Sequence, residues 1–596
     1  MADVASKKNK KLPACDYCKV KRVLCHPQQN GSCPRCLEKG ITCNTTPVTR
    51  RKRRTKAELE EERAVSTSGR SSSAEVPGPQ SKTGNASNSL EIWRRSSPQH
   101  SAPSIYINLA SPSLDISPSL VKELFQDLRI LPQYYYPFLP LDDLEASLDS
   151  CSWNVHALAP QDRVLAQCII AISARISTSS LIVDLGNRNI DNVTKCAPLK
   201  TRYLDCRQFG RRREQFCQQM RAEAVWLAQR EGVMFNICIA NAVSLVLLEF
   251  LEYRASGKGG SVYSAAYFHQ LRQLSEDDFG NVEVAPYTPT SFSALLMGLA
   301  VCAATTGKSV PFSYNDELLL CGEDGTSLEQ ILNVLSPDSV VETPIFDVMR
   351  PMCFHTIHVA RDISETLTGA YARRHPLNET KLTGHLHTLD LLHSAITCGL
   401  GQMQRLRPTA DEDFFQKMRF CAYPLIHGWS SLVLLVFEEL KGRRELIRLT
   451  EVDGSSRIPT HFDSLYIQVR SMASQAALEL ATSLEEIPTL SRLTHMNYSD
   501  LRKWPTFLLE DASELNVAQR VWALERFRAG LSLAGFSWVD RTDTVEAIDA
   551  YLASCTIEEI TGGLSSIIWP LTPATSCDTE NLILDWLQIQ SSPVLT

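Results

Sequence analysis

The chain has 596 residues, of which 44% are hydrophobic and 21% are charged. This length is too great for one ordinary domain, and the composition is typical of a globular protein with a large buried core. The start of the chain is polar and rich in lysine, and the apolar runs are too short to span a bilayer. We therefore expect an intracellular protein without a secretory signal or a membrane segment.

The net charge of −7 is unevenly distributed along the chain. Residues 1–56 contain 15 lysines and arginines against three acids, a net charge of +12, which leaves 45 basic and 64 acidic residues, a net charge of −19, for the remainder. A basic segment attached to an acidic body suggests that only this segment meets a polyanion. A solubilising charged tail is the alternative, and the ordered spacing of the cysteines argues against it.

Six of the 19 cysteines lie within residues 15–43, after a basic arm (residues 1–14), and the other 13 are scattered. The six form two similar halves, each with two cysteines separated by two residues and a third cysteine after six more: Cys15, Cys18 and Cys25, then Cys33, Cys36 and Cys43. Thiolates suit zinc, and six of them can serve two zinc ions if two thiolates bridge. The alternatives are a disulfide framework, a single four-cysteine zinc site with two spare cysteines, or chance clustering.

This spacing resembles the Zn2Cys6 (zinc binuclear cluster) domain of fungal transcription factors. The resemblance implies two Zn²⁺ ions per chain. Cys15 and Cys33 would bridge them, Cys18 and Cys25 would complete one site, and Cys36 and Cys43 would complete the other. It also implies two short helices related by a pseudo-twofold axis, each starting at a cysteine pair, and it implies double-stranded DNA as the partner.

A basic stretch after the second cysteine matches the basic stretch of that family. The resemblance implies that the end of the first helix enters the major groove and reads a CGG-type triplet. Lys21 and Arg22 are our candidates for base contacts, because lysine and arginine can donate to O6 and N7 of guanine. Lys19 and Arg35 are candidates for phosphate contacts. All four side chains could instead be solvated surface charge.

Three positions depart from the family pattern. Leu24 replaces the usual lysine before the third cysteine, and His26 replaces the usual aspartate after it. The proline that commonly precedes the fourth cysteine is also absent. We expect His26 to be a surface residue rather than a zinc ligand, since the cysteines fill both sites. The departures leave the DNA sequence that is read undetermined.

Residues 44–64 form a second basic segment. Its run of five cations predicts a nuclear localisation signal for an import receptor, a phosphate-binding arm, or both, with solvated charge as the alternative: Arg50, Arg51, Lys52, Arg53 and Arg54. No heptad seam follows, so a coiled-coil dimer is not supported and the oligomeric state stays open. Residues 65–104 are rich in Ser, Pro, Gly and Asn and predict a disordered linker.

Residues 105–570 are predicted to form a large all-α domain. Ser117 caps a helix that places Leu120, Val121, Leu124 and Leu128 on one face. Further helices are expected over residues 216–228 (ending at Gly232), 237–251 (buried), 262–274, 344–370, 381–405, 412–446, 461–485 and 515–535. Residues 134–139 and 224–232 resemble parts of the regulatory middle domain that accompanies these zinc clusters, which implies a regulatory role.

Residues 571–596 form the C-terminal tail. Residues 578–589 mix acids with large apolar side chains, as activation segments that fold on a coactivator do, although an amphipathic helix docked on the body fits equally well.

No hydrolase, zinc-protease or P-loop motif occurs, and no carboxylate motif completes a metal site with the histidines of the body: His355, His358, His385, His387 and His393. The sequence therefore predicts a nuclear, sequence-specific regulator of RNA polymerase II genes and not an enzyme. We favour an activator of a metabolic or secondary-metabolite gene set. A helical enzyme or scaffold with a zinc-cluster targeting module is the alternative.

Overall fold

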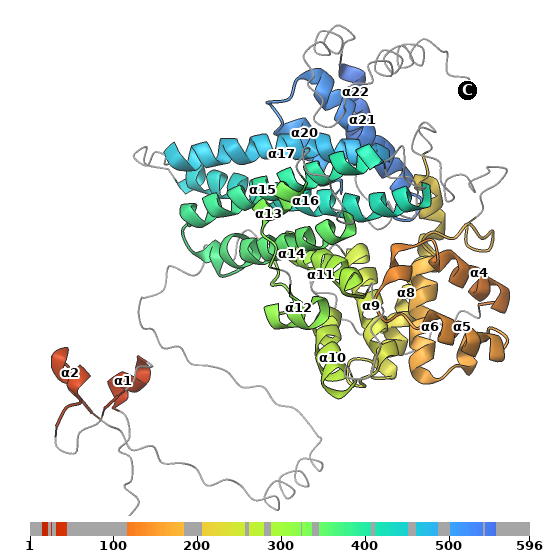
Figure 1. The fold of residues 1–596 in the computed structure, drawn as a ribbon, viewed down its shortest axis with the longest axis horizontal. Coiled ribbons are helices and arrows are strands. Elements are labelled where there is room, and N and C mark those ends of the chain that lie inside the picture. Colours follow the sequence, from red (N-terminus) through yellow and green to blue (C-terminus); the bar gives the residue numbers. More distant parts are fainter. Residues whose placement is uncertain are drawn as a thin grey trace, which may run out of the picture. The chain divides into compact units, whose positions relative to one another are not determined.

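The computed structural model describes residues 15–21, 25–26, 31–44, 116–183, 205–256, 262–278, 288–323, 325–335, 345–406, 412–450, 460–486, 501–539 and 543–555. The chain divides into two compact units, Met1–Tyr106 and Ile107–Thr596 (Figure 1). Helices account for the regular structure of both, and the described residues include no strand. The predicted helical character of the chain is therefore confirmed for this part. The linker, the basic run of residues 50–54 and the C-terminal tail lie outside it.

The described part of the first unit, which we call the head (residues 15–44), contains two short helices, α1 (Asp16–Val20) and α2 (Pro34–Glu38). Each helix begins directly after a cysteine, because Cys15 and Cys33 are the N-caps and have extended backbones. The buried centre of the head consists of thiols: Cys15, Cys18, Cys33 and Cys36, with Tyr17, Cys25 and Cys43 packed around them. Within the described residues of the head, this cluster offers much less apolar burial than usually stabilises a domain.

The second unit, which we call the body, contains in chain order α4 (Pro118–Leu128), η2 (Pro132–Tyr135), α5 (Leu141–Ser150), η3 (Val155–Ala157), α6 (Pro160–Ser173), α8 (Arg207–Arg230), α9 (Ile239–Ser256) and α10 (Val262–Asp278). It continues with α11 (Thr288–Thr305), α12 (Tyr314–Cys321), α13 (Leu328–Val334), α14 (Ile345–Ile363), η4 (Ser364–Thr368), η5 (Ala372–Arg374), α15 (Glu379–Leu406), α16 (Glu412–Thr450), α17 (Thr460–Glu486), α20 (Lys503–Glu510), α21 (Val517–Ala534) and α22 (Thr544–Ser554).

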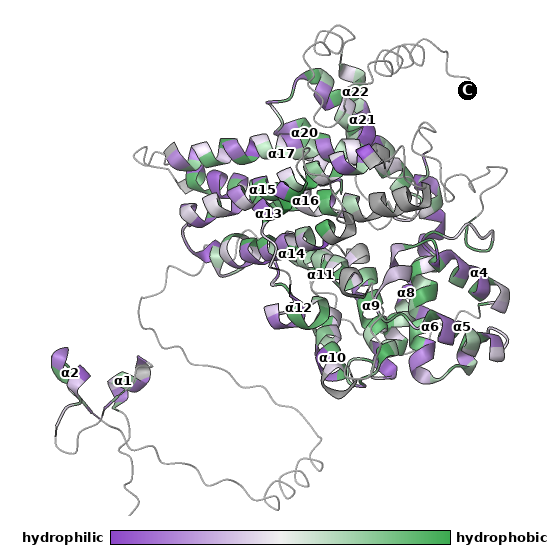
Figure 2. Cartoon of the chain, in the orientation of Figure 1, coloured by the Kyte–Doolittle hydropathy of each residue, from purple (hydrophilic) through white to green (hydrophobic). Residues whose placement is uncertain are grey.

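The first helices of the body pack around α6 and α9. Helix α4 starts where the sequence predicts, because the Ser117 hydroxyl accepts a hydrogen bond from the backbone N–H of Leu120, 3.4 Å away. Its apolar face is buried against α6, which also contacts α8 and α9. Figure 2 shows how strongly hydrophobic residues dominate α9, which packs against both α6 and α10. The predicted buried helix is thus confirmed, although it starts at Ile239 and not at Ile237.

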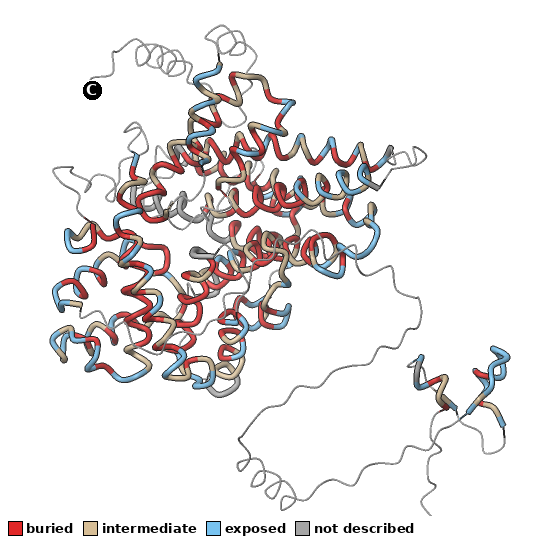
Figure 3. The backbone as a smooth tube through the Cα atoms, turned by 180° about the vertical axis from the view of Figure 1, so that it is seen from behind, coloured by how far each residue is buried: buried red, intermediate tan, exposed pale blue. Residues whose placement is uncertain are grey.

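Long helices form the rest of the body. Helix α14 packs against α11, α15 and α16, and α16 packs in turn against α15 and α17 (Figure 1). Their inward sides are buried along most of their length (Figure 3). The predictions for residues 344–370, 381–405, 412–446, 461–485 and 515–535 are confirmed as α14 with η4, α15, α16, α17 and α21. Within the described part of the chain, no helix has the length and apolar character that crossing a membrane requires.

The start of α8 packs directly against the turn that follows α21. Gly210 lies so close to this turn that a Cβ atom added there would collide with the backbone oxygen of Gly535. The buried guanidinium group of Arg213 donates to the carbonyl oxygen of Ala174 at 3.1 Å and stacks 4.0 Å from the centre of the Phe536 ring. The contacts with Gly535 and Phe536 join elements more than 300 residues apart in the sequence.

Candidate metal centre

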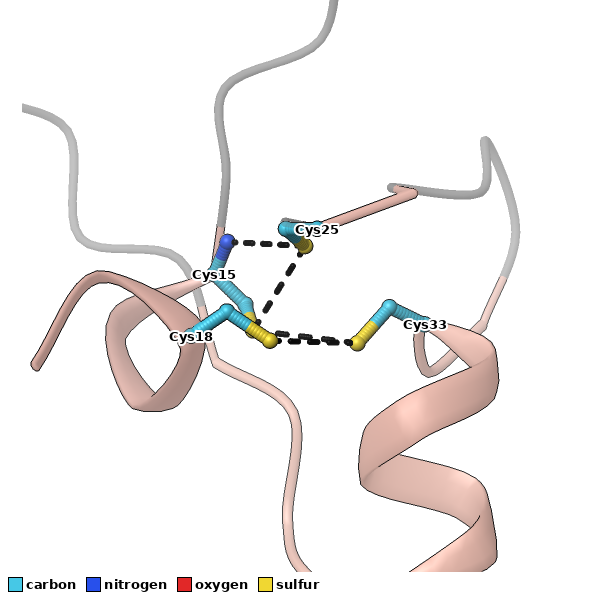
Figure 4. Close-up of side chains that lie close together, drawn as sticks. All are labelled: Cys15, Cys18, Cys25 and Cys33. Atoms are coloured by element: carbon cyan, nitrogen blue, oxygen red, sulfur yellow. Dashed lines mark hydrogen bonds between the residues drawn. The ribbon is translucent and has the colours of Figure 1, made fainter. Parts of the chain in front are cut away.

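The six clustered cysteines form two groups of four sulfur atoms. One group contains Cys15, Cys18, Cys25 and Cys33, and the other contains Cys15, Cys33, Cys36 and Cys43. Within each group all sulfurs lie within 4.8 Å of one another, near enough to hold a metal ion. Two residues, Cys15 and Cys33, belong to both groups. Figure 4 shows how the side chains of the first group converge from the start of α1, the start of α2 and the segment between them.

The distances between sulfur atoms fit a tetrahedral thiolate site. The Cys15 sulfur lies 3.8 Å from the sulfurs of Cys33 and Cys25 and 3.7 Å from that of Cys36. Four thiolates at the usual Zn–S distance form a tetrahedron whose edges measure about 3.8 Å. A disulfide would need a separation of about 2 Å, and all six cysteines are free thiols. The disulfide alternative therefore does not describe the head.

The two halves of the cluster repeat one hydrogen-bonding pattern. The backbone N–H of Cys15 donates to the sulfur of Cys25 at 3.5 Å, and that of Cys33 donates to the sulfur of Cys43 at 3.3 Å. In both cases the donor lies ten residues before the acceptor. A single four-cysteine site with two spare thiols would give no reason for this repeat, whereas two equivalent sites would.

In both halves, the pKa of the first cysteine of the pair is lowered and that of the second is raised. The backbone of Cys18 lowers the pKa of Cys15 to about 6, and the backbone of Cys36 lowers the pKa of Cys33. Burial has the opposite effect on the second cysteine of each pair, because it raises the pKa of Cys18 to about 12 and also raises that of Cys36. Crowded thiols of this kind ionise together when a divalent cation offsets their charge.

The basic residues chosen from the sequence lie on the surface of the head where they are described. Lys19 and Lys21 are exposed at the end of α1, and Arg35 is exposed on α2. The structure thus places Lys19 and Lys21 together at one helix end and places Arg35 on the other helix. Arg22, the second candidate for a base contact, lies outside the described residues. His26 is exposed.

Two residues that the sequence analysis missed take part in the geometry of the head. The Asp16 carboxylate accepts a hydrogen bond from the Lys19 ammonium group at 3.3 Å. The backbone N–H of Asp16 donates to the carbonyl oxygen of Asn44 at 2.9 Å, which ties the end of the cluster to its beginning. The separation of three residues between an acid and a base was a usable signal for the first contact.

Three of the histidines that the sequence analysis considered make separate contacts in the body. His358 pairs with Glu317 at 2.9 Å, and His393 pairs with Glu479 at 2.6 Å. His385 hydrogen bonds to a threonine hydroxyl. In the described part of the chain, the cysteines are the residues close enough together to hold a metal. A small pocket between α13, α14, α15 and α16 has a lining without ionisable groups: Leu335, Val348, Met349, Met352, Ile396, Gly399, Leu400, Ala422 and Leu425.

Comparisons of the chain with models of known protein families, with curated proteins and with solved structures found no match.

Proposed function

We propose that the head binds two zinc ions in a Zn2Cys6 cluster, in which the sulfurs of Cys15 and Cys33 bridge the ions. Cys18 and Cys25 complete one site, and Cys36 and Cys43 complete the other. The observation that carries this proposal is that both groups of four sulfurs contain the same two cysteines. Zinc supplies a structural cross-link here, because the buried centre of the head consists of thiols and offers little apolar surface.

The role of the cluster in this proposal is to hold α1 rigidly against double-stranded DNA. Lys21 and Arg22 contact guanine edges in the major groove, in a CGG-type triplet, while Lys19 and Arg35 contact phosphates. The support is the exposure of the described side chains and the net charge of +12 on residues 1–56. The acidic remainder of the chain would not favour a polyanion, which points to the head as the DNA-binding part.

The function that follows is sequence-specific regulation of transcription in the nucleus. The basic run of residues 50–54 serves as the import signal, and the helical body carries regulatory contacts with partners such as a coactivator. The proposal assigns no enzymatic site to the body, since in its described part His358 and His393 pair with different glutamates and the apolar pocket has no ionisable lining.

The test uses the full chain, purified with its metal. We expect about two zinc ions per chain by elemental analysis. The zinc-loaded chain is then mixed with a pool of random duplexes, and the bound fraction is sequenced. We expect CGG triplets to be enriched, and we expect the enrichment to vanish after chelation and to return with added zinc. A metal content well below two per chain, or a zinc-loaded chain that enriches no sequence, would contradict the proposal.

A further inference from the structure

The ion pair between Asp16 and Lys19 is present in one half of the head and has no counterpart in the other. Its two side chains are each 38% exposed, and the Lys19 Nζ lies 3.3 Å from the Asp16 Oδ1. In the second half, Pro34 and Leu37 occupy the equivalent positions, counted from the cysteine pair. Neither residue can form an ion pair.

The pair is therefore not needed to build the helix on which it lies. Helices α1 and α2 have the same length and begin after cysteines with similar backbone angles, and in each half the N–H of that cysteine donates to the sulfur of the cysteine ten residues later. α2 reaches this geometry without an ion pair. The difference between the halves is thus a property of the surface that α1 presents and not of the metal site.

We infer that Asp16 limits the affinity of the head for DNA by competing with the phosphates for the ammonium group of Lys19, which weakens the phosphate contact that Lys19 makes. The inference rests on the proposed function and adds a residue to it. Asp16 offers Lys19 a carboxylate at a distance at which a phosphate oxygen would otherwise bind, and it places a negative charge on the helix that faces the polyanion. Lys19 consequently contributes less to phosphate binding than its position suggests, and the base contacts account for a larger share of the affinity.

Counterion release makes this inference measurable. Each phosphate that a cation neutralises adds about 0.9 to the slope of log affinity against log salt concentration. Lys19→Gln alone should change the slope by well under this amount, because Asp16 competes with the phosphates for the Lys19 ammonium group. Asp16→Asn should steepen the slope by about 0.9, which corresponds to a three- to fourfold larger loss of affinity between about 50 and 200 mM salt. The double variant should return to the slope of the unaltered protein.

The experiment titrates the zinc-loaded full chain into two duplexes of equal length, one with a CGG triplet and one of random sequence, at several salt concentrations. A phosphate contact carries no sequence information, so Asp16→Asn should raise the affinity for both duplexes by the same factor. The matched control is Glu38→Gln, which removes one exposed negative charge from α2. It should leave the slope unchanged.

Three results would overturn the inference. They are an unchanged slope in Asp16→Asn, a loss of about one slope unit in Lys19→Gln alone, and a loss of zinc from Asp16→Asn, which would make the pair structural. Failure of the proposed function looks different, because the unaltered protein itself would then show no preference for any duplex.

Discussion

The sulfur atoms of Cys15 and Cys33 lie 3.8 Å apart, and each belongs to both groups of four thiols in the head. This relationship divides the six cysteines into two kinds. Two of them are shared, and the other four each serve one group. Substitutions at the two kinds of position should therefore have different effects on the metal content.

Replacement of a shared cysteine should release more metal than replacement of an unshared one. We expect Cys43→Ser to lose about one zinc ion per chain and Cys33→Ser to lose both, because the second substitution removes a ligand from each site. Elemental analysis of the full-length variants measures this. Cys238→Ser, in the body, is the control and should keep the full content. Equal losses from Cys43→Ser and Cys33→Ser would contradict bridging.

The proposed base contacts should be separable from phosphate contacts by their sequence dependence. Arg22→Ala or Lys21→Ala should cost about 1–3 kcal/mol on the preferred duplex and relax the preference at one base pair, since each side chain reads a guanine edge. Titrations on preferred and random duplexes at one salt concentration give the comparison. Arg35→Ala is the control, because a phosphate contact should weaken both complexes alike. An equal loss on both duplexes after Arg22→Ala would remove that residue from base recognition.

The close approach of α8 to the turn after α21 predicts a sensitive glycine. Gly210→Ala should destabilise the body by about 1–3 kcal/mol, because the added methyl group meets the backbone oxygen of Gly535 and the backbone must shift. Chemical denaturation followed by circular dichroism measures the change. Gly298→Ala on α11 is a matched control, since a Cβ atom there meets nothing within 4 Å. The control should be neutral or stabilising by up to about 1 kcal/mol. Similar stabilities for the two variants would argue against the contact.

Glu223, on α8, should make the stability of the body depend on pH. Its side chain is buried, its Oε2 atom has no hydrogen-bond partner among the residues that the structure describes, and burial raises its pKa to about 7. The folded state therefore binds this proton more tightly than the unfolded state does, and the free energy of unfolding should fall as the pH rises from about 4.5 to about 7.

Glu223→Gln removes this dependence. We expect the variant to be more stable than the unaltered protein by about 3 kcal/mol above pH 7, and about equally stable near pH 4, where the carboxyl group is mostly protonated in both states. Unfolding curves at the two pH values provide the measurement. Glu329→Gln is a useful contrast, because a hydrogen bond to its own backbone lowers the pKa of Glu329, so this variant should lose stability at neutral pH. A constant difference between Glu223→Gln and the unaltered protein at all pH values would rule out ionisation as the cause.

Helices with both an apolar stripe and a cap, and the long apolar run of α9, could be predicted from the sequence, whereas α6, α11 and α12 were not. α4 has both features, and its start at Ser117 was predicted correctly. α6 and α11 are apolar on nearly every side, so they lack the periodic contrast that identifies a helix. α12 is short and depends on a capping box between Ser313 and Asp316, a pattern too common to be decisive alone.

The candidate site was also predicted in part: the grouping of the cysteines was predicted, and the contacts around them were not. Spacing alone indicated that the six cysteines belong together, because a repeated local pattern needs no knowledge of the rest of the fold. The contact between Asp16 and Lys19 was missed, although its residues are three apart, since many such pairs on helices do not meet. The stacking of Arg213 on Phe536 spans more than 300 residues, and no local pattern encodes it.

The thiol-filled centre of the head has a consequence for the whole chain. Among the described residues of the head, thiols make up the buried cluster, so the head should depend on its metal for stability, whereas the body has a large core of its own. If the proposed function holds, scarcity of zinc would abolish DNA recognition without lowering the abundance of the protein. Restoring the metal would bring back activity from molecules already made, with no need for new synthesis.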